Sequence, residues 1–331
     1  MRQEKKMSRS AEQKVKLLVL YDLLEKKTDE DHPMTTNDIV EELAKLGITA
    51  TRQTLYDDIE VLNSFGYDII CEHGRNNHYY VADRTFERPE VQILLHAVGA
   101  AKFLTEKKAS ALSEKIAELL NPQQAEELRF GVPDCVGKSN NERILYSIDV
   151  ITSALLNKKQ ISFLYYDVDV NGKKLYRKDK ERYVVNPLGL VYSGEYFYLV
   201  CFHDKYGDPA NYRIDKMEDV CEEKQSITKK KEYDNFDLNA YRKESFSMFS
   251  GEKVEVTLFF PRDLIYVAKE RFGDIIPVSV DNGYIIHTTV RVSKTFFAWL
   301  STFEGQVKII DPKPTRQQFK EFITGILAKI E

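Results

Sequence analysis

Residues 51–62 read TRQTLYDDIEVL, and their spacing decides the fold expected for the first part of the chain. Leu55, Ile59 and Leu62 recur at intervals of four and three residues, which is the period of one face of a helix. Thr51 carries a hydroxyl oxygen that can accept from an amide of the first turn, so it is the expected N-cap. The start of this helix leaves four side chains outside the buried face: Arg52, Gln53, Thr54 and Tyr56.

The segments around this helix complete a DNA-binding layout. Residues 17–25 have helical apolar spacing, and a second helix is expected to begin at Thr35 or Thr36. Residues 67–72 and 78–81 are β-prone runs on either side of a turn rich in Gly and Asn, which is a hairpin signal. Three helices followed by a hairpin predict a winged helix-turn-helix. In that layout the third helix fits the major groove of double-stranded DNA, and the hairpin contacts the backbone or the minor groove.

The first turn of the third helix is the part expected to read DNA bases. Arginine pairs bidentately with guanine and glutamine with adenine. Arg52, Gln53 and Tyr56 are therefore the expected base readers, and Arg75 in the hairpin turn is expected on a phosphate. The predicted DNA-binding set is Thr51, Arg52, Gln53, Thr54, Tyr56 and Arg75.

The charge of this first segment favours a different kind of partner. Residues 1–83 hold eleven Lys and Arg against sixteen Asp and Glu, whereas DNA-binding domains are usually basic. A winged helix that binds a protein is therefore the alternative. Basic residues are nevertheless dense in residues 1–16, which we interpret as either a solvated tail or an arm that contacts phosphate.

Length and composition bound the class of protein. The chain has 331 residues, enough for two or three domains, and its 19 Tyr and 18 Phe are too many for a disordered chain. Its formal net charge is -4, so any contact with nucleic acid must come from a local basic surface. The four cysteines form no C-x-x-C pair, which argues against a zinc ribbon and a disulfide scaffold and indicates reduced thiols in a cytoplasm. No apolar run is long enough to span a membrane.

The rest of the chain changes character twice. Helical segments give way near residue 158 to short strands in close succession, which predict a small barrel or curled sheet. From residue 250, strands and helices alternate. The predicted fold class is multidomain α+β. Its predicted domains are a winged helix-turn-helix at 11–83, a helical linker at 84–157, a strand-rich domain at 158–225 and an α+β extension at 250–330.

Two stretches carry family resemblances. Residues 51–59, followed by 66–69, resemble the recognition helix and wing entry of DeoR-type winged helices. Residues 196–200 (YFYLV) and 211–217 (NYRIDKM) resemble the WYL domain, whose name-giving triplet is matched by residues 197–199 with Phe in place of Trp. The resemblance implies a small Sm-like or SH3-like β-barrel with a basic and aromatic ligand groove, followed by the extension that commonly follows WYL domains. It also implies a homodimer.

The strand-rich domain carries side chains suited to an anionic ligand that bears a base. Arginine offers a planar fork of donors for phosphate, and tyrosine offers a face for stacking. The predicted ligand-binding set, for a nucleotide or a single-stranded nucleic acid, is Arg182, Tyr198, Arg213 and Lys216. The alternative is structural: Tyr198 would lie in the core, and Arg213 would pair with Asp215 or Glu218.

These patterns lead to one expected function and two alternatives. The chain has no convincing arrangement of nucleophile and base, so we expect no enzyme activity, no metal and no cofactor. We expect a cytoplasmic, homodimeric transcriptional regulator that binds double-stranded DNA and whose WYL domain adjusts operator binding in response to a ligand. One alternative is a nucleic-acid-responsive cofactor whose winged helix binds a protein such as RNA polymerase. The other is a nucleotide-processing enzyme.

Overall fold

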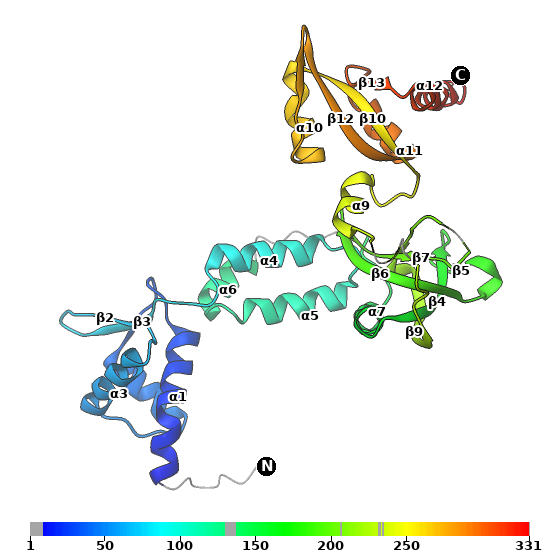
Figure 1. Cartoon of the computed structure of the whole chain (residues 1–331). Coiled ribbons are helices and arrows are strands. Elements are labelled where there is room, and N and C mark those ends of the chain that lie inside the picture. Colours follow the sequence, from blue (N-terminus) through cyan, green and yellow to red (C-terminus); the bar gives the residue numbers. More distant parts are fainter. Residues whose placement is uncertain (1–8, 130–136, 206, 231–232, 234, 331) are drawn as a thin grey trace. The chain divides into compact units, whose positions relative to one another are not determined.

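The structure is a computed structural model, and it describes residues 9–129, 137–205, 207–230, 233 and 235–330 (Figure 1). The chain forms two compact units. The first is Met1–Ala101 with Glu106–Gly137, and the second is Lys102–Thr105 with Lys138–Glu331. The short segment Lys102–Thr105 thus belongs to the second unit, although the chain on either side of it belongs to the first.

The described part of the first unit starts with three helices and an antiparallel sheet of strand order β1-β3-β2. All three helices contribute completely buried side chains to one core, among them Leu20, Leu24, Leu43 and Leu55. The three predicted helices and the hairpin are confirmed, and a two-residue strand that the sequence did not predict pairs with the hairpin. The elements are α1 (Arg9–Lys27), β1 (Met34–Thr35), α2 (Thr36–Lys45), α3 (Arg52–Ser64), β2 (Ile69–Glu72) and β3 (His78–Val81).

Local sequence starts two of these helices in the predicted way. Thr35 caps α2 and Thr51 caps α3, and each hydroxyl accepts from the backbone amide three residues further on, at 3.3 Å. In return, the side chains of Asp38 and Thr54 accept from the backbone amides of the two caps. These reciprocal capping boxes satisfy amides that a helix leaves open at its start. The position of the predicted base readers at the start of α3 is therefore set by the sequence of α3 itself.

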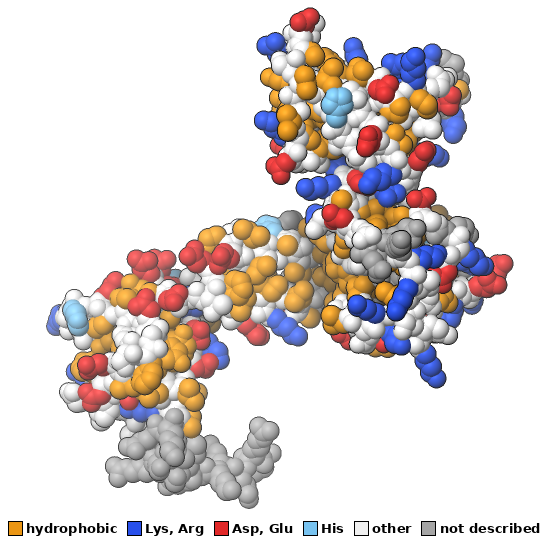
Figure 2. All heavy atoms as spheres, viewed as in Figure 1, with side chains coloured by type: hydrophobic (Ala, Val, Ile, Leu, Met, Phe, Trp, Pro, Cys, Tyr) orange, Lys and Arg blue, Asp and Glu red, His pale blue; other side chains and the backbone are white. Residues whose placement is uncertain are grey.

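Further helices complete the described part of the first unit: α4 (Arg88–Ala100), α5 (Glu106–Ala117) and α6 (Pro122–Arg129). Their small core consists of Val91, Leu95, Leu120 and Leu128. Figure 2 shows hydrophobic side chains gathered on the surface over α4 and α5. Ile93 of α4 is 69% exposed, and Leu112 of α5 is 38% exposed. These helices therefore present an apolar surface as well as a buried core.

The second unit is built on a curled antiparallel sheet of order β5-β4-β6-β7-β8, in which β9 also pairs with β4. Helix α7 packs on this sheet, and its Ser153 and Asn157 hydrogen-bond the carboxylate of Glu222 on β9. The predicted curled sheet is confirmed, whereas a closed barrel remains a prediction. The elements are α7 (Ile144–Asn157), β4 (Lys159–Val168), β5 (Lys174–Tyr176), η1 (Arg177–Lys180), β6 (Tyr183–Ser193), β7 (Tyr196–Phe202), β8 (Ala210–Arg213), η2 (Ile214–Lys216) and β9 (Met217–Ser226).

Two features of this sheet differ from the sequence-based prediction. The sequence predicts two separate strands at 181–187 and 189–192, but β6 runs through Leu188 with only a register irregularity between Pro187 and Gly189. Proline has no amide to donate to a ladder, which explains why the sequence looked interrupted there. Strand β9 was not predicted, because it carries four acidic residues and only Met217 and Val220 are buried. Its pairing with β4, rather than its own propensity, makes it a strand.

The C-terminal part of the second unit has an antiparallel sheet of order β11-β12-β10-β13. Its core contains the completely buried Leu258, Phe260, Ile286 and Phe296, and the predicted alternation of strands and helices is confirmed. The elements are α9 (Leu238–Glu244), β10 (Glu252–Pro261), η3 (Arg262–Leu264), α10 (Ile265–Phe272), β11 (Val278–Val280), β12 (Gly283–Val292), α11 (Lys294–Ser301), β13 (Lys308–Asp311) and α12 (Lys313–Leu327).

Helix α9 packs closely on the curled sheet. A Cβ atom on Gly189 of β6 would come within 2.5 Å of the Leu238 side chain, so the absence of a side chain at this glycine permits the contact. Asn211 of β8 donates to the hydroxyl of Tyr241 at 2.8 Å and to the backbone carbonyl of Met248 at 2.7 Å. These contacts fix α9 against β6 and β8.

Candidate functional site

A small cleft of about 120 Å³ brings together three of the predicted DNA-binding residues. Arg52 and Tyr56 come from the first turns of α3, and Arg75 comes from the turn between β2 and β3. The guanidinium of Arg52 donates to the side-chain oxygen of Asn37 at 2.9 Å. We call this hollow the arginine cleft, and its lining is Thr35, Thr36, Asn37, Arg52, Tyr56, Arg75, Asn76 and Asn77.

The arginine cleft differs in charge from the segment that contains it. Its lining has two arginines and no acidic residue, although residues 1–83 are acidic as a whole. Several acids of this segment are held by internal cations instead. Glu42 accepts from Lys27 at 2.5 Å and from Lys45 at 2.6 Å, and these bonds lower the pKa of Glu42 to about 2. The acidic composition therefore does not describe the surface at the start of α3.

The other three predicted DNA-binding residues lie outside the arginine cleft. Gln53 is exposed, and its amide donates to the Asp57 carboxylate at 3.3 Å along the same helix. Thr51 and Thr54 are exposed, and their hydroxyls are used in the capping box of α3. These two threonines position the helix start, whereas Arg52 and Tyr56 present side chains into the cleft.

Lys16, a residue of α1, contacts the beginning of α3 from inside the folded unit. It is only 8% exposed, and its ammonium lies 2.5 Å from an oxygen of Asp58 and 3.0 Å from the Thr54 hydroxyl. In the sequence it belongs to the basic N-terminal arm, but its contacts join α1 to α3. Residues 1–8 of that arm lie outside the described part of the chain.

In the second unit, Tyr198 and Arg213 are directly paired across β7 and β8. The Arg213 guanidinium donates to both oxygens of Asp215, at 3.1 and 2.7 Å, and its central carbon lies 3.3 Å from the centre of the Tyr196 ring. The sequence offers Asp215 and Glu218 as ion-pair partners of Arg213, and in the structure Arg213 pairs with Asp215. Tyr198 is half-buried against Val191 and its neighbours, and burial raises its pKa.

The two remaining predicted ligand residues contact other parts of the sheet. Lys216 donates to Asp167 at 2.6 Å, and Asp167 also pairs with Arg177 at 2.8 Å. Arg182 donates to the hydroxyl and the carbonyl of Ser162, at 3.0 and 3.1 Å. The structure therefore does not gather the four predicted residues around one hollow.

A cluster of aromatic side chains that the sequence did not single out is formed by residues of β4, β6 and β8 and by the residue after β7. Phe163 and Tyr183 stack with ring centres 5.5 Å apart, and Tyr212 meets them edge-on at 5.1 and 5.3 Å. The hydroxyl of Tyr212 lies 2.7 Å from the Nε2 atom of His203. We call this the tyrosine cluster, and its members are Phe163, Tyr165, Tyr183, His203 and Tyr212.

A basic segment covers the tyrosine cluster. The ammonium of Lys178 lies 4.0 Å from the centre of the Tyr183 ring, and the Arg177 guanidinium lies 5.2 Å from that of Tyr165. Residues 178–180 all have positive φ, at 53°, 49° and 68°, although none is glycine. Each such residue costs about 1–3 kcal/mol and persists only where the surroundings impose it. We call Arg177–Lys180 the basic strap.

Burial controls the ionisation of the tyrosine cluster. It raises the pKa of Tyr165 to about 12 and raises that of Tyr212 as well, so both hydroxyls stay protonated. Burial lowers the pKa of His203, and the nearby Lys178 ammonium lowers it further. The cluster is therefore uncharged at neutral pH, and its cations come from the strap.

The pKa of His203 predicts a pH-dependent stability. Its folded-state pKa lies below its unfolded value of 6.5, so the unfolded chain binds the proton more readily. The contribution of His203 is present above that value and is lost as the pH falls through it. Between about pH 7.5 and about pH 5.5, the wild-type melting temperature should fall further than that of His203→Gln. Equal falls in differential scanning calorimetry would contradict this assignment.

Comparison with known proteins gives the class of the second unit. Residues 147–222 match the family model described as the WYL domain. The match runs from α7 to β9 and includes the basic strap and the tyrosine cluster. The second unit thus contains a WYL domain, as its sequence resemblance implied.

Two solved structures are similar to larger parts of the chain. One is the proteasome accessory factor B/C (PafBC) of Arthrobacter aurescens, at 18% identity and a TM-score of 0.31 over 95% of this chain and 48% of that one. The chain therefore spans about half the length of that protein. The other is a CRISPR Cas-related protein, at 13% identity and a TM-score of 0.35 over 75% of both chains. No curated protein sequence matches the chain.

Two kinds of feature are absent from the described residues. No helix among them is both long enough and apolar enough to cross a membrane. Within the same residues, no group of three His, Cys, Asp or Glu side chains is arranged to hold a metal ion.

Proposed function

We propose that the protein is a DNA-binding transcriptional regulator. The first unit would act through a DeoR-type winged helix-turn-helix, and the WYL domain, as a small Sm-like or SH3-like barrel, would respond to a nucleotide or a single-stranded nucleic acid. The observation that carries the proposal is the arginine cleft, which joins the start of α3 to the hairpin turn. In a winged helix, these are the parts that meet the major groove and the DNA backbone.

The chemistry of the arginine cleft suits a DNA strand. Arg52 and Arg75 offer planar forks that match phosphate or the edge of guanine. Asn37, Asn76 and Asn77 add uncharged donors and acceptors, and Tyr56 is 38% exposed beside them. An acidic segment can bind a polyanion such as DNA only through a local basic surface. The arginine cleft, with two cations and no acidic residue, is such a surface.

The tyrosine cluster suits the ligand of the WYL domain. Bases stack on aromatic rings whatever their sequence, and cations beside the rings hold the phosphates. Here the strap places Arg177 over the Tyr165 ring on β4 and Lys178 over the Tyr183 ring on β6, while Lys180 lies over the neighbouring Tyr176 ring on β5. A ligand that stacks on Tyr183 would displace Lys178 and move the strained strap, which would link ligand binding to a change in conformation.

Replacing Lys178 tests this ligand site. Lys178→Ala should weaken binding of a fluorescent single-stranded oligothymidylate to the full chain by about 3- to 10-fold, because it removes the cation closest to the rings. Lys173→Ala, which removes an exposed cation from the turn before β5, is the matched control. Fluorescence anisotropy measures both. Equal affinities of the two variants would remove the tyrosine cluster from the proposal.

The proposed active form is a homodimer. Two winged helices that read paired half-sites multiply their specificity. Hydrophobic side chains gather on the surface over α4 and α5, the helices that carry the exposed Ile93 and Leu112, and this is the kind of surface that a second copy would cover (Figure 2). We propose no catalytic activity, because the Tyr212 hydroxyl that lies beside His203 in the tyrosine cluster has a pKa raised by burial and stays protonated, which makes it a poor nucleophile.

A protein partner for the winged helix is the second candidate function. Phe65 at the end of α3 is 81% exposed, Leu18 of α1 is 68% exposed and Val61 of α3 is 42% exposed. Exposed apolar side chains of this size are typical of surfaces that meet another protein. The nucleic-acid-responsive cofactor, bound to a protein such as RNA polymerase, would use this end of α3 rather than its start.

One experiment separates the two functions. Genomic fragments retained by the purified full chain would be sequenced. A recurrent palindromic motif supports the DNA-binding regulator, because a dimer reads two related half-sites. Retention without any preferred sequence supports the cofactor.

A further inference from the structure

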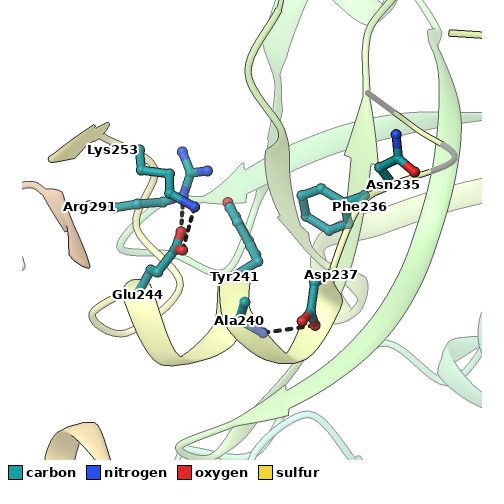
Figure 3. Close-up of a pocket in the computed structure, with 8 residues that line it drawn as sticks. All are labelled: Asn235, Phe236, Asp237, Ala240, Tyr241, Glu244, Lys253 and Arg291. Carbon is teal, nitrogen blue, oxygen red and sulfur yellow. Dashed lines mark hydrogen bonds and ion pairs between the residues drawn. The ribbon is translucent and has the colours of Figure 1, made fainter. Parts of the chain in front are cut away.

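A second hollow, with a volume of about 410 Å³, lies beside α9 in the second unit (Figure 3). It contains no member of the arginine cleft or of the tyrosine cluster. Its lining comes from α9 and the segment before it, from the start of β10 and from the end of β12. These lining residues are Asn235, Phe236, Asp237, Ala240, Tyr241, Glu244, Lys253 and Arg291.

Arg291 is the most unusual group in this cavity, because it is a buried cation with an unfilled donor. The residue is only 6% exposed. One terminal nitrogen donates to the carbonyl of Gly251 at 3.1 Å, but the buried Nε atom has no hydrogen-bond partner. Its ion-pair partner, Glu244 Oε2, is 3.7 Å away, which is beyond hydrogen-bond range. Buried donors in native proteins almost always have an acceptor, so the positive charge of Arg291 is only partly compensated by the protein.

The charges around Arg291 favour an anion at this end of the cavity. Glu244 shares its single negative charge between two cations, since its other oxygen lies 2.6 Å from the Lys253 ammonium. Asp237 is engaged elsewhere, because its carboxylate accepts from the amides of Asn239 and Ala240 at the start of α9. The Arg291 end of the cavity therefore has one positive charge in excess.

The middle of the cavity is less polar than this end. In Figure 3, Tyr241 and Ala240 lie between the cluster of Glu244, Lys253 and Arg291 and the side chain of Phe236. The Tyr241 ring already faces the Arg291 guanidinium, whose central carbon lies 4.6 Å from the ring centre. A ligand with its charge at Arg291 would thus place its uncharged body beside Tyr241, Ala240 and Phe236.

We propose that this cavity binds a small organic carboxylate. The carboxylate pairs with the Lys253 ammonium at the positively charged Arg291 end, and the apolar body fills the space beside Ala240 and Phe236. The apolar side chains beside the charged end are the reason why we assign an organic carboxylate rather than a simple inorganic anion. Such a ligand contacts α9 on one side and β10 and β12 on the other, and its binding is independent of the DNA and nucleic-acid sites proposed above.

Calorimetric titration of the full chain tests the site with benzoate as the probe. We expect saturable binding of benzoate and none of benzamide, which has the same shape without the charge. Lys253→Gln should lower the affinity for benzoate about tenfold, because it removes one charge-assisted contact. Ala240→Met should abolish binding by filling the cavity without changing any charge. Neither residue is fully buried, so both variants should fold.

Arg242→Gln is the matched control, since it removes an exposed cation from the same helix outside the cavity lining. It should bind benzoate as the wild type does. Three results would overturn the proposal: no benzoate binding by the wild type, undiminished binding by Ala240→Met, or tighter binding of inorganic phosphate than of benzoate. None of these results affects the DNA-binding proposal, which rests on the other unit.

Discussion

A variant that carries both Arg52→Ala and Arg75→Ala is expected to bind operator DNA about 100-fold more weakly than the wild type. The two arginines are the cations of the arginine cleft, and a good bidentate base contact is worth about 1–3 kcal/mol. Both side chains are exposed, so their removal should leave the fold intact. Fluorescence anisotropy with the operator found by fragment selection measures the loss, and circular dichroism verifies the fold.

Lys45→Ala is the control for a simple loss of positive charge. Lys45 is an exposed cation at the end of α2, where it pairs with Glu42 outside the arginine cleft. The salt dependence of binding adds a second readout, because the slope of log K against log salt falls by about 1 for each phosphate that the protein no longer neutralises. A double variant that binds operator as tightly as Lys45→Ala would mean that DNA does not enter the arginine cleft.

The parts of the molecule that the sequence predicts well are those decided by local interactions. Thr51 caps α3 because its hydroxyl reaches an amide only three residues away, and Thr35 does the same for α2. The hairpin follows from a turn rich in Gly and Asn between two β-prone runs. Arg52, Tyr56 and Arg75 could be selected together because the winged-helix layout brings the start of the third helix beside the hairpin turn.

The tyrosine cluster could not be predicted in the same way. Its rings come from β4, β6 and β8 and from the residue after β7, and they meet only when the sheet curls. In the sequence, Tyr165, Tyr183 and Tyr212 are three of 19 tyrosines, without a shared spacing. The one available signal was the run of three basic residues within 177–180, but a run of charges is more often a solvated face.

Arg213, one of the predicted ligand residues, shows what the pattern of a strand cannot predict. Arg213 was expected to face a ligand because it points away from the side of β8 that carries Tyr212. That reasoning gives the face of the strand but not the partner, and Asp215, two residues along the chain, already occupies both arms of the guanidinium. Its role in ligand binding stays a prediction, in which a ligand phosphate must compete with Asp215.

Replacing Lys16 with Met is expected to lower the free energy of unfolding of the first unit by about 2–3 kcal/mol. Breaking one side of a buried ion pair costs about 3–5 kcal/mol, because the remaining charge is left without a partner. The Asp58 side chain is 21% exposed, so contact with water reduces the cost of leaving its charge unpaired. Urea unfolding followed by circular dichroism gives the change. Hydrogen exchange of peptides from α1 and α3 assigns it to the first unit.

The double variant Lys16→Met/Asp58→Leu separates the ion pair from the packing of α1. Removing both charges leaves no unpaired ion, so most of the missing stability should return. The two single losses would add instead if Lys16 and Asp58 acted independently, and additive losses would contradict the assignment.

The same variants also bear on DNA binding. Lys16 contacts Thr54 as well as Asp58, which lie in the first and second turns of α3, the helix that begins at Arg52. Lys16→Met should therefore loosen the start of α3 and weaken operator binding, although Lys16 is buried and faces away from solvent.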